Sequence, residues 1–294
     1  MAMKRYVRLE GRALVRVSGT DARPFLQGLI SNDIERASPG RAIYAALLTP
    51  QGKYLFDFFI CELGGAILLD CERARRDALV KRLAVYRLRS QVTIAPDDSF
   101  EVFAVFGDGA AAALGLDGTA GNACPFAGGL ALVDPRIAAA GVRAVLPSET
   151  GAKALEDAGV ERADFADYDA ARLRLGLPDG SRDLEIERSL LLENGFEELN
   201  GVDFAKGCYV GQEVTTRMKR RALVRKRLMP VAIEGPAPEP GTIVMRDGIE
   251  VGEMRSTAGK AGLALLRLDL VDGAATLDAG EARITPRAPA WLTS

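Results

Sequence analysis

The sequence contains no histidine, and this absence excludes several kinds of catalytic site. None of the 294 residues is His. Ser–His–Asp and Cys–His nucleophilic schemes use an imidazole as the general base, and the facial-triad iron site uses two histidine ligands. Any nucleophile in this chain must therefore be activated by groups other than imidazole.

Cysteine is scarce, and its spacing indicates neither a metal site nor a disulfide framework. The chain has four cysteines, at positions 61, 71, 124 and 208, with no CxxC pair. The single cysteine of the segment around Cys208 and the absence of histidine cannot supply the four ligands of a zinc site or cluster, so we predict that the isolated monomer holds no tightly bound iron or zinc. Cys61 and Cys71 adjoin apolar segments, where cysteine is usually a small buried hydrophobic residue.

Long apolar runs and a strong net charge are also missing. No stretch approaches the ~18 uncharged apolar residues of a membrane span, and the first residues lack the apolar segment of a signal peptide. The few cysteines fit a reducing compartment. We therefore expect a cytoplasmic protein with no membrane partner. The net charge of −2 provides no global attraction for nucleic acid, so any attraction for anions must be local.

Apolar periodicity in the first third predicts alternating strands and helices. Residues 12–17 alternate like a half-buried strand. Thr20 can cap a helix that carries Phe25, Leu26, Leu29 and Ile30 on one face.

The next hundred residues continue this mixed pattern, which predicts an α+β fold. Strands are expected at 55–61, 66–69, 92–94 and 100–106. A helix is expected over 72–89 with Leu79, Leu83 and Tyr86 facing inward. The Gly- and Ala-rich residues 107–130 are expected to be a connection of loop and short helix.

From about residue 225 onward, short β-like segments alternate with Gly, Pro and Asp. This spacing is typical of a small antiparallel barrel or sandwich. The segment GPAPEPG, residues 235–241, is expected to form a hairpin or loop within it.

The charge of the chain reverses across Cys208. Residues 181–203 contain seven acids against two arginines, and residues 206–227 contain eight bases against Glu213 alone. Two interpretations stay open. The runs are either two solvated faces, or a basic rim that attracts a polyanion beside a pocket lined by acids.

Cys208 lies in the segment KGCYVGQEVTTR, where its neighbours favour a thiolate. Lys206 brings a cation, and residues 211–217 are typical of the first turns of a helix, with Glu213 and Arg217 spaced to pair. A lysine and a helix N-terminus both lower the pKa of a cysteine. Cys208 and Lys206 are therefore candidate catalytic residues, and the alternative is an inert, buried cysteine.

KGCYVGQE, residues 206–213, resembles the K-G-C-Y-x-G-Q-E signature of the YgfZ family. These are folate-binding proteins related to the aminomethyltransferase (T protein) of the glycine cleavage system. Residues 21–34, 47–60 and 189–213 are similar to other landmarks of the family. The resemblance covers most of the chain and is weakest in the C-terminal β region.

The resemblance implies an aminomethyltransferase-like fold of three domains around a central channel that binds tetrahydrofolate. Residues 1–47 and 138–222 would form a discontinuous α+β folate-binding domain. Residues 48–137 would form an inserted α+β domain, and residues 223–294 a C-terminal β-barrel.

The same resemblance implies a function in assembly or repair of iron–sulfur proteins, including enzymes that modify tRNA. The expected cofactor is tetrahydrofolate or a derivative, including polyglutamylated folate, and the expected protein partners are iron–sulfur clients or assembly proteins. No metal site is expected. The candidate folate-binding residues are Asn32, Asp57, Glu193, Gln212, Glu213 and Arg217.

Two other functions are weighed against this one. A one-carbon transferase needs a carboxylate close to the folate nitrogens, and where aminomethyltransferases have two adjacent acids this chain has Phe56-Asp57. An RNA-binding scaffold could use the basic run, but residues 210–227 contain no aromatic residue for base stacking. Direct nucleic-acid binding is therefore not expected.

Overall fold

The computed structural model describes residues 4–271 and 275–292. The chain divides into two compact units, each built from separated segments. Unit 1 comprises Met1–Leu48, Leu55–Phe165 and Leu199–Val210, and unit 2 comprises Thr49–Tyr54, Ala166–Glu198 and Gly211–Ser294. The expected division into three domains with bounds at 47, 137 and 222 stays a prediction.

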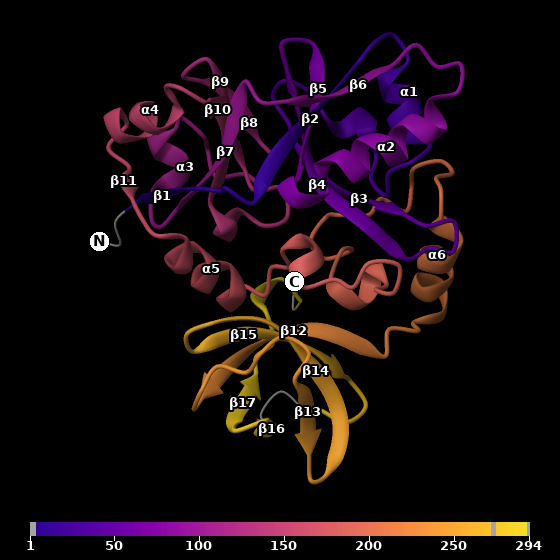
Figure 1. Cartoon of the computed structure of the whole chain (residues 1–294), viewed down its shortest axis with the longest axis vertical. Helices are drawn as coiled ribbons and strands as arrows, with labels where there is room; N and C mark the ends of the chain where they lie inside the picture. The colour runs from indigo at the N-terminus through magenta and orange to yellow at the C-terminus, as the bar shows by residue number, and fades with distance from the viewer. Residues whose placement is uncertain (1–3, 272–274, 293–294) are drawn as a thin grey trace. The chain divides into compact units, whose positions relative to one another are not determined.

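A five-stranded sheet with the order β3-β4-β5-β2-β6 forms one layer of unit 1 (Figure 1). Helices α1 and α2 contribute Phe25, Leu26, Leu79 and Leu83 to the apolar core against this sheet. The strands and helices are β2 (Arg12–Ser18), β3 (Ile43–Leu48), β4 (Tyr54–Leu63), β5 (Ala66–Glu72), β6 (Thr93–Asp97), α1 (Ala22–Gln27) and α2 (Arg76–Arg87).

A six-stranded sheet with the order β11-β1-β7-β10-β9-β8 forms the other sheet of unit 1. Its buried residues, among them Phe103, Val105 and Leu146, make a second core together with residues of α3 and α4. The elements are β1 (Arg5–Arg8), β7 (Phe100–Phe106), β8 (Ala123–Phe126), β9 (Gly129–Val133), β10 (Val142–Pro147), β11 (Glu161–Arg162), α3 (Ala110–Ala113) and α4 (Gly151–Asp157).

Unit 2 contains a closed barrel with the strand order β12-β15-β14-β13-β16-β17, which confirms the predicted C-terminal barrel (Figure 1). Residues 235–241 join β12 to β13, and these two strands are not neighbours, so the segment is a connecting loop and not a hairpin. The strands are β12 (Lys226–Glu234), β13 (Ile243–Arg246), β14 (Ile249–Ala258), β15 (Ala261–Arg267), β16 (Leu277–Ala279) and β17 (Ala282–Pro286).

Two further helices precede the barrel strands in sequence, and short 3₁₀ turns occur along the chain. None of the helices in the described ranges is long and apolar enough to cross a membrane. The helices are α5 (Phe165–Arg174) and α6 (Gln212–Arg221), and the 3₁₀ turns are Ile34–Arg36, Arg73–Arg75, Ala138–Ala140, Gly180–Arg182, Leu191–Asn194 and Ala290–Leu292.

Both helices predicted in the first third are shorter than the sequence indicates. The first helix has Asp21, not Thr20, at its N-cap and ends at Gln27, although the four apolar residues expected on its face all reach the same core. The second begins only at Arg76, because Glu72 completes β5 and a 3₁₀ turn follows. Tyr86 is only partly buried against that core.

The segment 107–130 is more ordered than a connection. Its last part forms a hairpin of β8 and β9. Ala127 and Gly128 both have positive φ (47° and 78°), as a tight two-residue hairpin turn requires. A Cβ at Gly129 would lie 2.1 Å from the carbonyl oxygen of Val145. The glycines read as loop residues therefore permit a turn and the close approach of two strands.

Candidate functional site

Cys208 is exposed on a loop whose neighbouring residues are anchored in unit 1. Its side chain is exposed, whereas Tyr209 is 7% exposed. The backbone N–H of Val210 donates to the carbonyl of Gly28. Helix α6 begins only at Gln212, four residues after Cys208. The helix start predicted within residues 211–217 is confirmed, and the anchored residues Tyr209 and Val210 lie between it and Cys208; its effect on the thiol stays a prediction.

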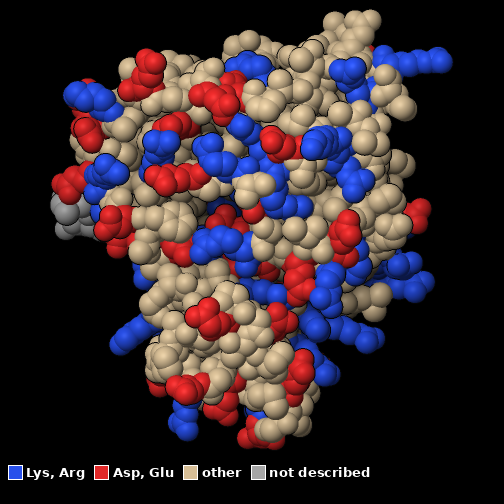
Figure 2. All heavy atoms as spheres, viewed as in Figure 1, with Lys and Arg blue, Asp and Glu red and all other residues tan. Residues whose placement is uncertain are grey.

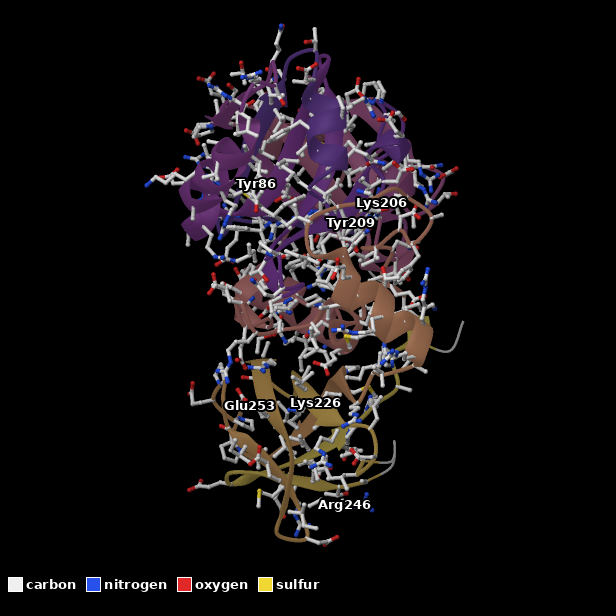
Figure 3. All side chains as sticks on the ribbon, turned by 90° about the vertical axis from the view of Figure 1, so that its right-hand side faces the viewer. Tyr86, Lys206, Tyr209, Lys226, Arg246 and Glu253 are labelled. Atoms are coloured by element: carbon white, nitrogen blue, oxygen red, sulfur yellow. The ribbon has the colours of Figure 1, made fainter. Side chains whose placement is uncertain are left out.

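Lys206 points inward from this loop. Its Nζ donates hydrogen bonds to the carbonyl oxygens of Gln27 (2.9 Å), Ile30 (2.6 Å) and Asn32 (2.8 Å). The same nitrogen lies 5.0 Å from the centroid of the Tyr209 ring (Figure 3). All three N–H donors of an ammonium are thus engaged by backbone carbonyls, and the ammonium can act on the Cys208 thiolate only through its charge.

Burial lowers the pKa of Lys206 to about 8, and the charges of Asp33 and Asp203 oppose that shift. The desolvation cost of the ammonium therefore exceeds the gain from its acidic neighbours. Asp203 also fastens the loop, since its Oδ1 accepts hydrogen bonds from the backbone N–H groups of Ala205 and Lys206.

Asn32 connects this loop to the rest of unit 1. Its Nδ2 donates to the carbonyls of Tyr44 and Asn200, at 2.7 Å each. Its Oδ1 accepts from the backbone N–H of Asp33. Both amide hydrogens are therefore used in holding the fold together, and folate binding by Asn32 stays a prediction.

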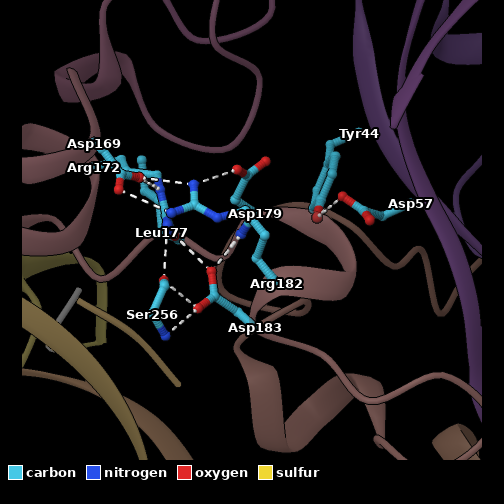
Figure 4. A network of polar contacts seen from close by, with 9 residues as sticks. All are labelled: Tyr44, Asp57, Asp169, Arg172, Leu177, Asp179, Arg182, Asp183 and Ser256. Carbon is cyan, nitrogen blue, oxygen red and sulfur yellow. Dashed lines mark hydrogen bonds and ion pairs between the residues drawn. The ribbon is translucent and has the colours of Figure 1, made fainter. Parts of the chain in front are cut away.

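Asp57 lies inside unit 1 beside Tyr44. Its carboxylate accepts a hydrogen bond of 2.9 Å from the Tyr44 hydroxyl and is 5% exposed (Figure 4). Burial, assisted by the charge of Asp57, holds the pKa of Tyr44 well above its usual value. A carboxylate in this position stabilises a buried phenol, and its predicted role as a folate contact remains a prediction.

Sequence reasoning missed a group of arginines around Phe59. The guanidinium carbons of Arg12, Arg136 and Arg143 lie 5.6, 4.9 and 3.8 Å from the centroid of this ring. Asp70 accepts hydrogen bonds from Arg12 and Arg143 and is 2% exposed. The only sequence signal is an acid within the apolar strand ILLDC, which indicates a buried charge that needs a partner.

Glu193 lines a pocket of about 310 Å³ within unit 2. Burial raises the pKa of Glu193, and the charges of Lys226 and Lys53 oppose this shift. Figure 3 marks Lys226 and Glu253 at the same end of the barrel. The pocket is lined by Lys53, Glu185, Arg188, Ser189, Leu190, Glu193, Lys226, Glu250, Gly252, Glu253, Arg255, Leu265 and Arg267.

One donor in this pocket has no acceptor. Arg255 is 9% exposed and makes ion pairs with Glu185 (2.6 Å) and Glu253 (2.9 Å). Its Nε is buried without a hydrogen-bond partner. An unpaired buried donor costs free energy that a ligand acceptor could recover.

Gln212, Glu213 and Arg217 lie on helix α6, along a shallow groove that also includes Thr216, Arg220 and Arg221. Basic side chains gather at the edge where Figure 1 places α6 (Figure 2). Within the described part of the chain, no ion pair joins Glu213 to Arg217. The three arginines of the groove are exposed.

The predicted residues thus fall into three local groups. Lys206, Asn32 and, through Tyr44, Asp57 are linked by hydrogen bonds beneath the Cys208 loop. Glu193 belongs to the pocket, and the other three line the α6 groove. Over the residues that the structure describes, no cluster of three or more Cys, Asp or Glu could hold a metal ion.

Residues 225–294 match a family model described as the CAF17 C-terminal beta-barrel domain. Over the whole chain, the fold is similar to the crystal structure of the glycine cleavage system aminomethyltransferase T from Bartonella henselae. The TM-score is 0.80 at 16% identity, and the match covers 99% of this chain and 86% of that one. This likeness concerns the fold alone. It confirms the expected fold class, α+β and aminomethyltransferase-like with a C-terminal β-barrel.

Two curated relatives carry the name iron-sulfur cluster assembly factor IBA57, mitochondrial. The protein from Mus musculus is 36% identical, over 97% of this chain and 84% of that protein. The protein from Homo sapiens is 37% identical, over 93% of this chain and 80% of that protein.

These relatives correct the predicted location. Both are named as mitochondrial proteins, which contradicts the expectation of a cytoplasmic protein. The scarcity of cysteine indicated only a reducing compartment and could not say which one. The YgfZ name is likewise not confirmed and designates a related family. By its identity with these proteins over most of its length, the chain belongs to the IBA57 family.

Proposed function

We propose that this protein takes part in the assembly of iron–sulfur clusters, with Cys208 as its reactive residue. The names of the IBA57 relatives support the first part. The second rests on one observation, that the thiol of Cys208 is exposed while Cys61 and Cys71 are buried. An exposed thiol on an anchored loop can meet a partner protein without local unfolding.

A single thiol can act on an iron–sulfur cluster only together with a partner protein that supplies the other ligands. Clusters are held by four protein ligands, most often cysteine thiolates, and this chain has one exposed cysteine and no histidine. The partner proteins must therefore carry the cluster. Iron–sulfur clients or assembly proteins fit this requirement, and clients that modify tRNA stay a prediction.

We further propose that the Glu193 pocket binds tetrahydrofolate or a derivative. A carboxylate accepts hydrogen bonds from the donor edge of a pterin, and the Nε of Arg255 offers a donor without a partner in the same pocket. The volume of about 310 Å³ is at the lower end for ligand pockets. The donor set therefore fits the group.

A one-carbon transferase has less support. Its proton chemistry needs a carboxylate accessible to the folate nitrogens. The carboxylate that sequence offered for this role, Asp57, is 5% exposed and already accepts a hydrogen bond from Tyr44.

The test is the activity of iron–sulfur enzymes in a strain that lacks the gene. Wild-type protein and the control Cys124→Ser should restore the activities, and Cys208→Ser should not. Glu193→Ala should restore them only in part. Unchanged activities in the deletion strain would contradict the assembly function, and full restoration by Cys208→Ser would remove only the role of the thiol.

A further inference from the structure

We propose that Lys206 is a positioning residue, whose half-buried ammonium fastens the Cys208 loop to the end of helix α1. The importance of Lys206 for function rests on the proposed role of Cys208. In this role Lys206 positions the loop and does not activate the thiol by its charge.

The acceptors explain why a lysine is needed at this position. Gln27 is the last residue of α1, and Ile30 and Asn32 follow within the turn that leaves the helix. The carbonyl groups at the end of a helix lack intrahelical partners and carry partial negative charge. One ammonium with three donors satisfies one such carbonyl, that of Gln27, together with the carbonyls of Ile30 and Asn32 in the turn that follows, at 2.6–2.9 Å.

Backbone hydrogen bonds hold the same loop on both sides of Lys206. The N–H of Asp203 donates to the carbonyl of Ser31 (3.0 Å), and the N–H of Val210 donates to the carbonyl of Gly28 (3.1 Å). Lys206, whose three hydrogen bonds form what we call the clamp, lies in sequence between Asp203 and Val210 and two residues before Cys208. The thiol is therefore held outward by attachments before and after it.

The charged groups near the ammonium do not provide an alternative partner for it. Asp33 and Asp203 are the acids that act on Lys206. Asp203 forms an ion pair with Arg36 at 2.6 Å, and Asp33 accepts from Gln27 Nε2 and from the backbone N–H of Glu35. The three carbonyls are thus the contacts that fix the ammonium.

The experiment compares Lys206→Met and Lys206→Arg with wild type and with Lys81→Met, which removes an exposed lysine of α2. Amide hydrogen exchange at Asp203 and Val210 reports the attachment of the loop, and the pH midpoint of Cys208 alkylation reports the charge effect. Lys206→Met should speed exchange at both amides at least about tenfold and leave the midpoint unchanged. Lys81→Met should change neither.

Unchanged exchange at both amides in Lys206→Met would overturn the inference. If the alkylation midpoint rises at the same time, the ammonium acts on the thiol by charge alone.

Lys206→Arg keeps the inference testable if Lys206→Met does not fold. A planar guanidinium keeps the charge but cannot direct its donors at three carbonyls arranged around one point. Faster exchange at Val210 in a cooperatively folded Lys206→Arg protein supports the clamp, and wild-type exchange contradicts it. If the loop loosens while Cys208→Ser still supports iron–sulfur enzymes, the clamp stands and the proposed role of the thiol fails.

Discussion

At the scale of single residues, the four cysteines are chemically distinct because their surroundings differ. Burial raises the pKa of the Cys61 and Cys71 thiols to about 12 and also raises that of Cys124. Cys208 alone among them is exposed. Since the thiolate is the nucleophile, the buried thiols should be unreactive near neutral pH.

We therefore expect iodoacetamide at pH 8 to modify Cys208 first. Cys61 and Cys71 should react roughly a thousandfold more slowly, because their thiolate fractions at this pH are that much smaller than that of an ordinary thiol. Peptide mapping over time gives the four rates. If Cys208 stays unmodified until denaturant is added, it is not an exposed nucleophile.

Glu193 should make stability depend on pH. Its pKa is raised in the folded protein, so its contribution to stability is present below the unfolded pKa and is lost as the pH rises through the folded pKa. Glu193→Gln, which stays neutral, should exceed wild type in free energy of unfolding at pH 7 and approach it at pH 3. Urea unfolding at several pH values measures the difference. An equal difference at both pH values would contradict the assignment.

The same substitution tests folate binding by calorimetry. Glutamine retains an acceptor but no charge, whereas Glu193→Ala has neither. We expect Glu193→Ala to bind tetrahydrofolate more weakly than Glu193→Gln, because the donor edge of a pterin loses its acceptor. The absence of binding by the wild type would remove folate from the proposal.

At the scale of elements, a buried ion network connects α5 to the barrel strand β14 within unit 2 (Figure 4). Arg172, 2% exposed, donates to Asp169 (2.6 Å), Asp183 (2.8 Å) and Ser256 (2.8 Å). Asp183 also accepts from the backbone N–H of Ser256. Each carboxylate is therefore buried beside a compensating cation.

Arg172→Met should lower the free energy of unfolding by about 3–5 kcal/mol, because it leaves the buried carboxylate of Asp183 without its cation, whereas Asp169 keeps its ion pair with Arg182. The matched control, Lys153→Met, breaks the exposed pair with Asp157 in α4 and should cost at most about 1 kcal/mol. Urea unfolding gives both values. Equal losses would mean that the buried network adds nothing beyond a surface pair.

The basic residues of the α6 groove predict how the binding of folate depends on its glutamate tail. If Arg217, Arg220 and Arg221 attract the glutamate tail, changing all three to Gln should abolish the tighter binding of the pentaglutamate over the monoglutamate. In the wild type that advantage should shrink as salt rises.

The control removes the same charge elsewhere, by changing Lys81, Arg87 and Arg89 of the α2 region to Gln. This variant should retain the pentaglutamate advantage. An advantage that does not depend on salt would identify the α6 run as a solvated face.

At the scale of the whole molecule, the shortage of ligands predicts a chain without stoichiometric metal. Protein purified without air should contain much less than one iron or zinc per chain by elemental analysis, because one exposed cysteine cannot hold a cluster. Addition of an iron–sulfur partner should be required before any cluster absorbance is associated with the chain. Stoichiometric metal in the isolated protein would contradict this.

Much of the fold could be predicted because local patterns carry it. The alternation of residues 12–17 predicted β2, and the short β segments after residue 225 predicted the barrel, since successive side chains of a strand alternate between its two faces. The expected half-burial of β2 is wrong, because residues on both of its faces are buried. The ends of α1 and α2 could not be predicted, because they depend on where a following strand or turn takes the chain. The β8–β9 hairpin was missed because glycine permits both a loop and a tight turn.

The candidate site, too, could be predicted from the sequence only in part. By itself, the sequence determined that no imidazole acts in this protein, that Cys208 stands in a distinctive motif, and that charge reverses around it. Only the tertiary structure decided that Lys206 turns inward to three carbonyls of residues 27–32, that Asp57 is paired with Tyr44, and that Glu193 shares a pocket with Arg255. The reason is that burial and hydrogen-bond partners come from residues distant in sequence, and these set both the direction and the pKa of a side chain.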